Sequence, residues 1–174
     1  MKKVLITGIT GMVGSHLADY LLKNTDWFIY GVCRWRSPLD NVNHLIDRVN
    51  KKDRLEFLYA DLCDSFSIDS ALKKSKPDYI FHLAAQSYPL TSFSSPISTL
   101  DTNILGTVRL LESVILNNLN PLIHVCSSSE VFGRVSEDKI PINEDCSFHP
   151  ASPYAISKVG TDLLGKYYAE AYGL

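Results

Sequence analysis

The chain has 174 residues, of which 45% are hydrophobic and 21% are charged, and its formal net charge is −2. A chain of this size forms one ordinary domain that buries roughly 70% of the surface exposed in its unfolded form. The near-neutral charge argues against nucleic-acid binding by electrostatic attraction, and no apolar run approaches the roughly 20 residues that span a membrane. The short apolar start stops at Thr7 and Gly8, so we expect no secretory leader.

Five short apolar runs alternate with longer amphipathic stretches. We expect strands over Val4–Thr7, Phe28–Val32, Leu55–Ala60, Tyr79–Ala84 and Leu122–Cys126. We expect helices over Met12–Lys23, Ser67–Lys74, Ser98–Asn118 and Pro153–Tyr172. Runs this short and this apolar are typical of strands buried on both faces of a parallel sheet. The alternation therefore predicts the α/β class, as a Rossmann-type doubly wound parallel sheet with helices on both faces.

Local signals refine the first two helices. In the first, Val13, Leu17, Tyr20 and Leu21 fall near helical spacing, which predicts one packed face. Asp64 precedes the second and is of a type that caps helix N-termini, so we expect it to accept hydrogen bonds from the first-turn N–H groups.

Two stretches lack a strong period. Pro38–Arg54 is polar with a weak helical pattern and is predicted to be a crossover connection. Gly133–Pro150 is predicted to be a long surface loop between the fifth strand and the last helix, and long loops are often functional. His82 and His124 lie inside apolar runs, which favours packed strand residues over metal ligands.

The four cysteines are Cys33, Cys63, Cys126 and Cys146. No two of them form a CxxC pair, and none is spaced with a histidine as zinc ligands are. The pattern is typical of cysteines that act as small hydrophobic residues in a reducing compartment, such as the cytoplasm.

Three glycines connect the first strand to the first helix. Gly8 permits a tight turn, Gly11 allows a pyrophosphate to approach the backbone, and Gly14 allows the helix to pack closely on the sheet. The backbone N–H groups of the helix start, at Met12, would face the anion. The spacing is GxxGxxG, so a glycine-rich turn without a ligand remains the alternative.

The end of the second strand predicts the type of dinucleotide. An acidic residue at this edge would bind the ribose hydroxyls of NAD, but here Arg34, Trp35 and Arg36 follow the strand. Two guanidinium groups suit a 2′-phosphate, which favours NADP, with NAD possible. A solvated basic turn is the alternative.

Tyr154 and Lys158 lie four residues apart at the start of the last helix, so they share one helical face. A phenol ionises near pH 10 in water and is a poor base at neutral pH. A neighbouring ammonium group stabilises the phenolate. The pair therefore predicts a tyrosine that moves a proton.

The fifth predicted strand ends in a run of hydroxyl side chains and one acid, Ser127, Ser128, Ser129 and Glu130. Ligands bind at the carboxyl ends of strands in such sheets. A hydroxyl there can hydrogen-bond a substrate oxygen, and a carboxylate beside it can transfer a proton. A loop acid or a cap is the alternative for Glu130.

Together these motifs resemble the extended short-chain dehydrogenase/reductase family over nearly the whole chain. The matching residues are Gly8, Gly11, Gly14, Asp61-Leu62, Leu83-Ala84-Ala85, Ser127–Glu130, Tyr154 and Lys158. Within that family the chain looks most like GDP-mannose 4,6-dehydratases, from the segments His82–Ser87, Ser92–Pro96, Ser127–Glu130 and Pro150–Lys158. The segment around Asn103 looks more like related epimerases and reductases.

The resemblance implies a role for each matching position. For the pyrophosphate it implies Gly8, Gly11, Met12 and Gly14, and for the 2′-phosphate it implies Arg34 and Arg36. Adenine would contact Asp61 and Leu62. The nicotinamide and its ribose would be lined by Leu83, Ala84 and Ala85. It implies a catalytic set of Ser128, Glu130, Tyr154 and Lys158. It also implies a substrate-binding set of Ser87, Ser128, Ser129 and Glu130, and Tyr154 and Lys158 would contact the cofactor as well.

The implied reaction is a nucleotide-sugar 4,6-dehydration. Tyr154 would accept the proton of the sugar 4-hydroxyl, and Glu130 would remove the C5 proton and assist the loss of the C6 hydroxyl. The alternatives are a GDP-4-keto-6-deoxymannose reductase, another nucleotide-sugar epimerase or decarboxylase, and a nucleotide-binding module without full activity.

Members of the family are roughly twice as long as this chain, so we expect residues 1–174 to form the cofactor-binding domain with the catalytic residues, without the C-terminal substrate domain. The resemblance also implies a homodimer or higher homo-oligomer through the helices Ser98–Asn118 and Pro153–Tyr172. Leu163, Leu164, Tyr167, Tyr168 and Tyr172 are the residues expected at that surface.

Overall fold

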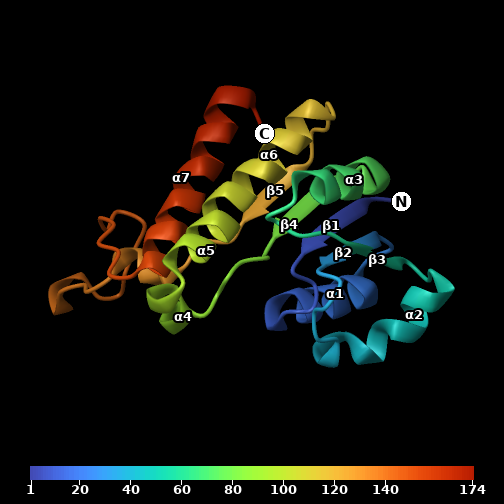
Figure 1. The fold of residues 1–174 in the computed structure, drawn as a ribbon, viewed down its shortest axis with the longest axis horizontal. Coiled ribbons are helices and arrows are strands. Elements are labelled where there is room, and N and C mark those ends of the chain that lie inside the picture. Colours follow the sequence, from blue (N-terminus) through green and yellow to red (C-terminus); the bar gives the residue numbers. More distant parts are fainter.

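The computed structural model describes residues 1–174, which form one five-stranded parallel sheet with helices on both faces (Figure 1). The strands are β1 (Lys3–Thr7), β2 (Phe28–Cys33), β3 (Leu55–Tyr59), β4 (Tyr79–His82) and β5 (Leu122–Val125). Their order is β3-β2-β1-β4-β5, so the direction of winding reverses between β1 and β4. This is the predicted Rossmann-type sheet, and the crevice at such a reversal is where ligands bind.

Eight helical segments connect the strands or follow the last one. The helices are α1 (Met12–Asn24), α2 (Ile46–Lys51), α3 (Ser65–Ser75), α4 (Pro89–Ser94), α5 (Pro96–Leu100), α6 (Gly106–Leu116) and α7 (Pro153–Tyr172), and a π-helical turn (Asp101–Leu105) joins α5 to α6. Short 3₁₀ turns cover Asp40–Leu45, Ser129–Phe132 and Glu137–Lys139. Asp64 caps α3 as predicted, because its carboxylate accepts from the N–H groups of Phe66 and Ser67, both at 3.2 Å.

Alternating residues of the strands pack into two hydrophobic cores, one on each face of the sheet. Val4 and Ile6 point to the face that α1 covers, whereas Leu5 points to the face that α3 and α6 cover. Each core contains 11 buried hydrophobic residues. Burying one large aliphatic side chain stabilises a fold by about 1.5–3 kcal/mol, so the sheet is held from both sides.

The packed face of α1 differs in part from the predicted one, since Leu21 is buried and Leu17 packs against the core as predicted. Val13 and Tyr20 are 54% and 63% exposed, and the buried face runs through Gly14, Ala18 and Leu21. The reason lies at Gly14, where an added Cβ would be 2.4 Å from the Gly8 carbonyl oxygen. This close approach rotates α1 so that its small residues, and not its large ones, face the turn.

Two strand predictions were wrong in part. β4 ends at His82, not at Ala84, because the N–H groups of Leu83 and Ala84 turn to the Thr7 hydroxyl, both at 3.1 Å. β5 is not buried on both faces: Leu122 is 69% exposed, and His124 is exposed rather than packed. β5 is an edge strand that pairs only with β4.

The predicted helix Ser98–Asn118 is also interrupted. The structure divides this region into α5, the π-helical turn and α6, and adds the unpredicted helix α4 before them. The expected crossover Pro38–Arg54 contains a 3₁₀ turn and α2. No helix is both long and apolar enough to cross a membrane.

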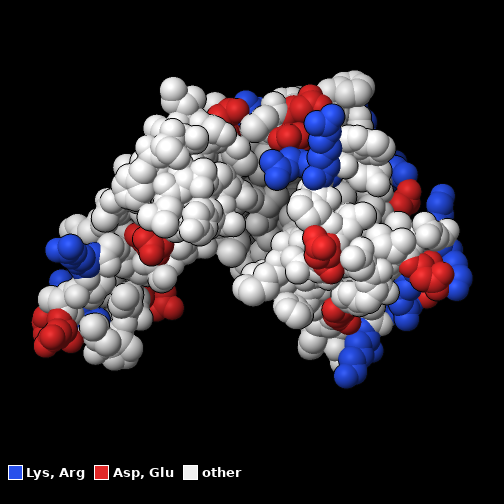
Figure 2. Space-filling model, turned by 60° about the horizontal axis from the view of Figure 1, so that its bottom comes forward, with Lys and Arg blue, Asp and Glu red and all other residues white.

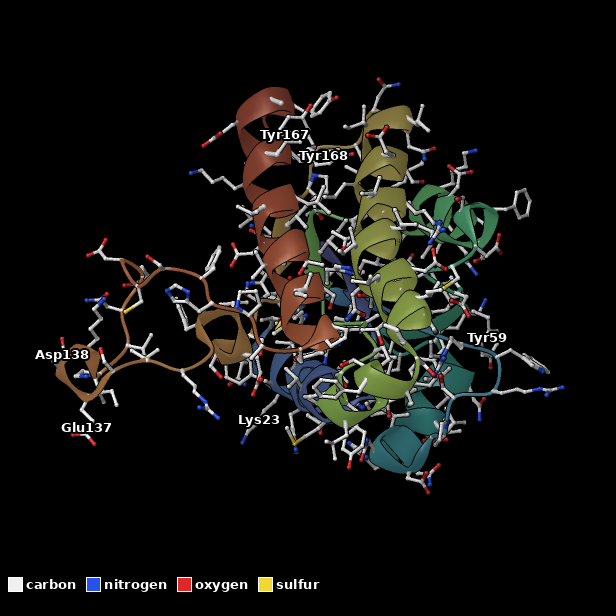
Figure 3. The ribbon with its side chains drawn as sticks, turned by 60° about the vertical axis from the view of Figure 1, so that its left-hand side comes forward. Lys23, Tyr59, Glu137, Asp138, Tyr167 and Tyr168 are labelled. Carbon is white, nitrogen blue, oxygen red and sulfur yellow. The ribbon has the colours of Figure 1, made fainter.

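The crevice lies between two parts of the molecule. Figure 2 shows the surface hollowed between the long loop and α4 on the left and α1 on the right. The long loop is the predicted Gly133–Pro150 segment, which carries only the turn Glu137–Lys139. Glu137 and Asp138 lie at its projecting tip, far from Tyr59 at the other side (Figure 3).

Candidate active site

The glycine turn forms a cradle that no side chain fills. Gly8 has a φ of +76°, and an added Cβ there would lie 2.9 Å from the Ala84 Cα. Its N–H donates to the Val32 carbonyl at 3.0 Å, so the turn is fixed to the end of β2. No side chain caps α1 and its first turn holds no acid, so the N–H groups at Met12 are available to an anion. The turn therefore fits a dinucleotide pyrophosphate.

A pocket of about 590 Å³ opens beside this turn, at the ends of β2 and β3. It is lined by Arg34, Trp35, Arg36, Tyr59, Ala60, Asp61, Asp64 and Ser67. The structure thus brings together the predicted Arg34, Arg36 and Asp61. It also adds Tyr59, whose ring meets Trp35 edge to face with centroids 5.2 Å apart. The two guanidinium groups suit a phosphate, and the flat rings suit a base.

Asp61 lines the pocket, whereas the side chain of its neighbour Leu62 points into the core. Its side chain is 4% exposed and packs in the core, where a Cβ on Gly106 would come within 2.8 Å of it. Leu62 therefore does not line the pocket, and its carbonyl oxygen accepts from Arg109 at 3.1 Å.

A buried chain of hydrogen bonds fixes the two strand ends at the reversal. Thr107 donates its hydroxyl hydrogen to the Asn103 carbonyl at 2.6 Å, so His82 Nε2 must donate to the Thr107 oxygen at 3.0 Å. His82 Nδ1 is then an acceptor, and Thr7 donates to it at 2.9 Å. Burial, with a smaller contribution from the positive charge of Lys158, lowers the pKa of His82 to about 4. His82 is therefore neutral at pH 7 and was not predicted to have this role.

Asn103, in the π-helical turn, links the segment after β4 to α7. Its amide oxygen accepts from the Gln86 N–H at 2.8 Å, and its amide nitrogen donates to the Gln86 carbonyl at 3.1 Å and to Ser157 Oγ at 2.8 Å. Ser157 donates to the Tyr154 carbonyl at 2.6 Å. A single residue that is 1% exposed thus sets the distance between the predicted nicotinamide wall, which includes Ala85, and α7.

Tyr154 and Lys158 occupy the buried face of α7. They are 8% and 7% exposed, and Ser152 caps the helix by accepting from the Ala155 N–H at 3.0 Å. Lys158 Nζ donates to the carbonyl oxygen of Cys126, at the end of β5, at 2.6 Å. Burial lowers the pKa of Lys158, and Cys126 partly offsets this.

The predicted hydroxyl and carboxylate lie on the element that α7 packs against. Ser128 ends the segment after β5 and begins the turn Ser129–Phe132, which contacts α7. Ser128 Oγ accepts from the Glu130 N–H at 3.2 Å, which leaves its hydroxyl hydrogen free to be donated. Glu130 and Ser129 are exposed, as is Ser87, just before α4.

The turn that follows Ser128 and contains Glu130 packs against α7, and the buried face of α7 carries the phenol of Tyr154 and the ammonium of Lys158. Such a set can move a proton on and off an alcohol and abstract a second proton from carbon. Sequence reasoning missed His82, Asn103 and Ser157 as members of this site. A polar residue buried within an apolar helix pattern was the available signal for Asn103.

A sequence profile for the family described as GDP-mannose 4,6 dehydratase matches residues 5–174. The chain belongs to this family. The GDP-mannose 4,6-dehydratase of Yersinia enterocolitica is 38% identical over 100% of this chain and 47% of its own length. GDP-mannose 4,6 dehydratase 1 of Arabidopsis thaliana is 38% identical over 99% of this chain and 49% of its own length. The chain spans about half the length of these curated relatives.

Solved structures match the same fold. UDP-glucose 4-epimerase from Thermotoga maritima, solved with UDP-glucose, has a TM-score of 0.83 and 29% identity over 98% of this chain and 52% of its own. RMD from Pseudomonas aeruginosa, solved with NADPH, has a TM-score of 0.76 and 28% identity over 99% of this chain and 51% of its own. The predicted resemblance to GDP-mannose 4,6-dehydratases among the extended short-chain dehydrogenases/reductases is confirmed.

Proposed function

We propose that the protein is a nucleotide-sugar 4,6-dehydratase that converts GDP-mannose, or a close analogue, to the 4-keto-6-deoxy sugar. The observation that carries this proposal is the buried Tyr154–Lys158 face of α7 beside the strand end with Ser128 and Glu130. The membership of the family supports the substrate class. We further propose that residues 1–174 are the cofactor-binding domain with the catalytic residues, and that the rest of a family member's length contributes to sugar-nucleotide binding.

The chain's residues would divide the proton transfers between them. A nicotinamide cofactor, when bound, supplies the hydride exchange that connects C4 with C6. Tyr154 takes the proton of the sugar 4-hydroxyl, and the Lys158 ammonium stabilises the resulting phenolate. Ser128 donates to the C4 oxygen as it becomes a ketone. The ketone acidifies the C5 proton, which Glu130 removes and passes on as the C6 hydroxyl leaves as water.

Glu130 distinguishes dehydration from the related reactions. We expect Glu130→Gln to bind NADPH as the parent does and to oxidise at C4, but not to eliminate water. Mass spectrometry of products from GDP-mannose measures this directly, since dehydration removes the mass of one water with no net change in cofactor. Unimpaired elimination by the variant contradicts the assignment. A reductase of 4-keto-6-deoxy sugars would instead consume NADPH stoichiometrically.

NADP is proposed over NAD because two guanidinium groups, Arg34 and Arg36, line the pocket at the end of β2. The NADPH found in the related RMD structure supports this choice. Titration with NADPH and NADH tests it: Arg34→Ala should weaken NADPH binding about ten-fold or more, through loss of a charge-assisted contact, and leave NADH binding nearly unchanged. Tighter binding of NADH by the parent protein contradicts the proposal.

A homo-oligomer is proposed through the outer faces of α5 and α7. Ile97 is 81% exposed, and Leu163, Tyr167 and Tyr172 are each more than half exposed. Tyr168 does not belong to this surface, because it is 5% exposed and donates to Glu112 of α6 at 2.5 Å. Tyr167 and Tyr168 lie in the second half of α7 (Figure 3). Sedimentation of a monomer at micromolar concentration contradicts the proposal.

A further inference from the structure

Two side chains of α7 attach to consecutive residues at the end of β5. Lys158 Nζ donates to the Cys126 carbonyl at 2.6 Å, and Ser127 donates its hydroxyl hydrogen to Asp162 Oδ2 at 2.9 Å. Because residues four apart lie on one face of a helix, the two contacts form a two-point attachment of the strand end to α7. Lys158 has a proposed chemical role, whereas Asp162 has none so far.

The two residues that join β5 to the following turn, Cys126 and Ser127, have few other supports. β5 is an edge strand, and its last link to β4 is the bond from the Cys126 N–H to the His82 carbonyl at 3.3 Å. In the turn that follows, the bonds from the Glu130 N–H to Ser128 Oγ and from the Val131 N–H to the Ser128 carbonyl are internal. The His149 N–H also donates to the Val131 carbonyl at 2.9 Å, and Val131 is 1% exposed, so the turn itself has further supports. The two contacts from α7 instead hold Cys126 and Ser127, the residues that join β5 to this turn.

The contact at Asp162 is a hydrogen bond to a carboxylate oxygen and not an ion pair. Asp162 forms no ion pair with a lysine or an arginine, and its partner is the neutral hydroxyl of Ser127. The ammonium of Lys158, one turn earlier, is directed at the Cys126 carbonyl instead. An amide oxygen can replace a carboxylate oxygen as the acceptor of a hydroxyl, whereas a methyl group cannot.

We propose that Asp162 is a positioning residue of the active site. Through Ser127 it fixes the end of β5, so that Ser128 and Glu130 are presented to the substrate at the correct distance from Tyr154. A misplacement of about 1 Å in a catalytic group can cost up to a hundred-fold in rate, so one remote hydrogen bond is sufficient for a measurable effect. The catalytic part of this inference rests on the proposed function, while the attachment itself does not.

Amide hydrogen exchange tests the attachment in the protein without substrate. In Asp162→Ala and in Ser127→Ala, the amides of Glu130 and Val131 should exchange about ten-fold faster, the factor expected for one lost hydrogen bond. The double variant should exchange no faster than either single variant, because both remove the same contact. Asp162→Asn should keep the parent rates within about two-fold, since its amide oxygen still accepts.

A matched control is available in the same protein. Ser113 of α6 donates to Asp69 of α3 at 3.3 Å, which is the same kind of contact between two helices away from the crevice. Ser113→Ala should leave the exchange of the turn amides unchanged. If Asp162→Ala accelerates exchange evenly across the sheet, or if Asp162→Asn behaves as Asp162→Ala does, the positioning role is overturned.

Kinetics with GDP-mannose test the catalytic consequence. Asp162→Ala should lower kcat about ten-fold and leave KM and the NADPH dissociation constant within about two-fold, the pattern of an interaction needed in the transition state. Asp162→Asn should restore kcat, and a loss confined to KM overturns the inference. If the parent enzyme does not act on GDP-mannose, the proposed function fails, and the exchange experiment still decides whether Asp162 holds the strand end.

Discussion

His82 makes the stability of the fold depend on pH in a predictable direction. Its pKa falls from 6.5 to about 4, first through burial and then through the charge of Lys158. The unfolded chain therefore binds more protons than the folded one between these values. The contribution of His82 is complete above pH 6.5 and is lost as the pH falls toward 4. At about 1.4 kcal/mol per unit, the full loss amounts to about 3 kcal/mol.

The assay compares the free energy of unfolding by urea for the parent and His82→Gln from pH 7.5 to pH 4.5. At pH 7.5 the variant has the lower free energy of unfolding, because it loses the hydrogen bonds to Thr7 and Thr107. All other titrating groups are common to both proteins, so they cancel in the difference. Relative to the variant, the parent should lose roughly 2.5 kcal/mol by pH 4.5.

An exposed histidine provides the control for this experiment. His16 lies on the outer face of α1, so His16→Gln should follow the pH dependence of the parent. If the parent and His82→Gln curves are parallel over this range, His82 is not held neutral by its surroundings and the reasoning is refuted. A steeper loss in the variant refutes it as well.

Three further substitutions test the site. Gly14→Ala should cost about 2 kcal/mol or more in urea unfolding and weaken NADPH binding, because the new Cβ meets the Gly8 carbonyl at 2.4 Å; unchanged binding contradicts the cradle. Asn103→Ala should lower the unfolding free energy by about 3 kcal/mol, because the half-buried backbone N–H and carbonyl of Gln86 and the buried Ser157 hydroxyl lose their partner; a loss below about 1 kcal/mol contradicts this. Tyr154→Phe should reduce kcat about a thousand-fold while NADPH binding persists, and activity near the parent level removes Tyr154 as the base.

The five strands could be predicted because their signals are local, whereas the strand order and the place of its reversal come from the structure alone. Short runs such as Val4–Thr7 are too apolar to be anything but core, and the glycine turn marks where β1 meets α1. The α1 face could not be predicted from periodicity alone. Val13 and Tyr20 have the hydrophobicity of core residues, but Gly14 requires a close contact that only tertiary structure reveals.

The site was predictable where residue type dictates chemistry and not where it depends on geometry. The four-residue spacing of Tyr154 and Lys158 predicts that they share one helical face, and both are buried in the structure. The amide bridge of Asn103 to Ser157 joins residues 54 apart in the sequence, so no local pattern contains it. The exposure of β5 has a similar cause, since sequence hydrophobicity does not tell an edge strand from a central one.

The π-helical turn separates the rotational phase of α5 from that of α6. An α-helix advances about 100° per residue, so a single deletion within Asp101–Leu105 would swing everything upstream by about that angle relative to Leu110 and Val114, which are anchored in the core. The amide of Asn103 would then leave Gln86. The wider turn thus allows one continuous helical segment to make two different contacts. Its α6 end packs in the hydrophobic core, and Asn103 holds the segment after β4 at the crevice.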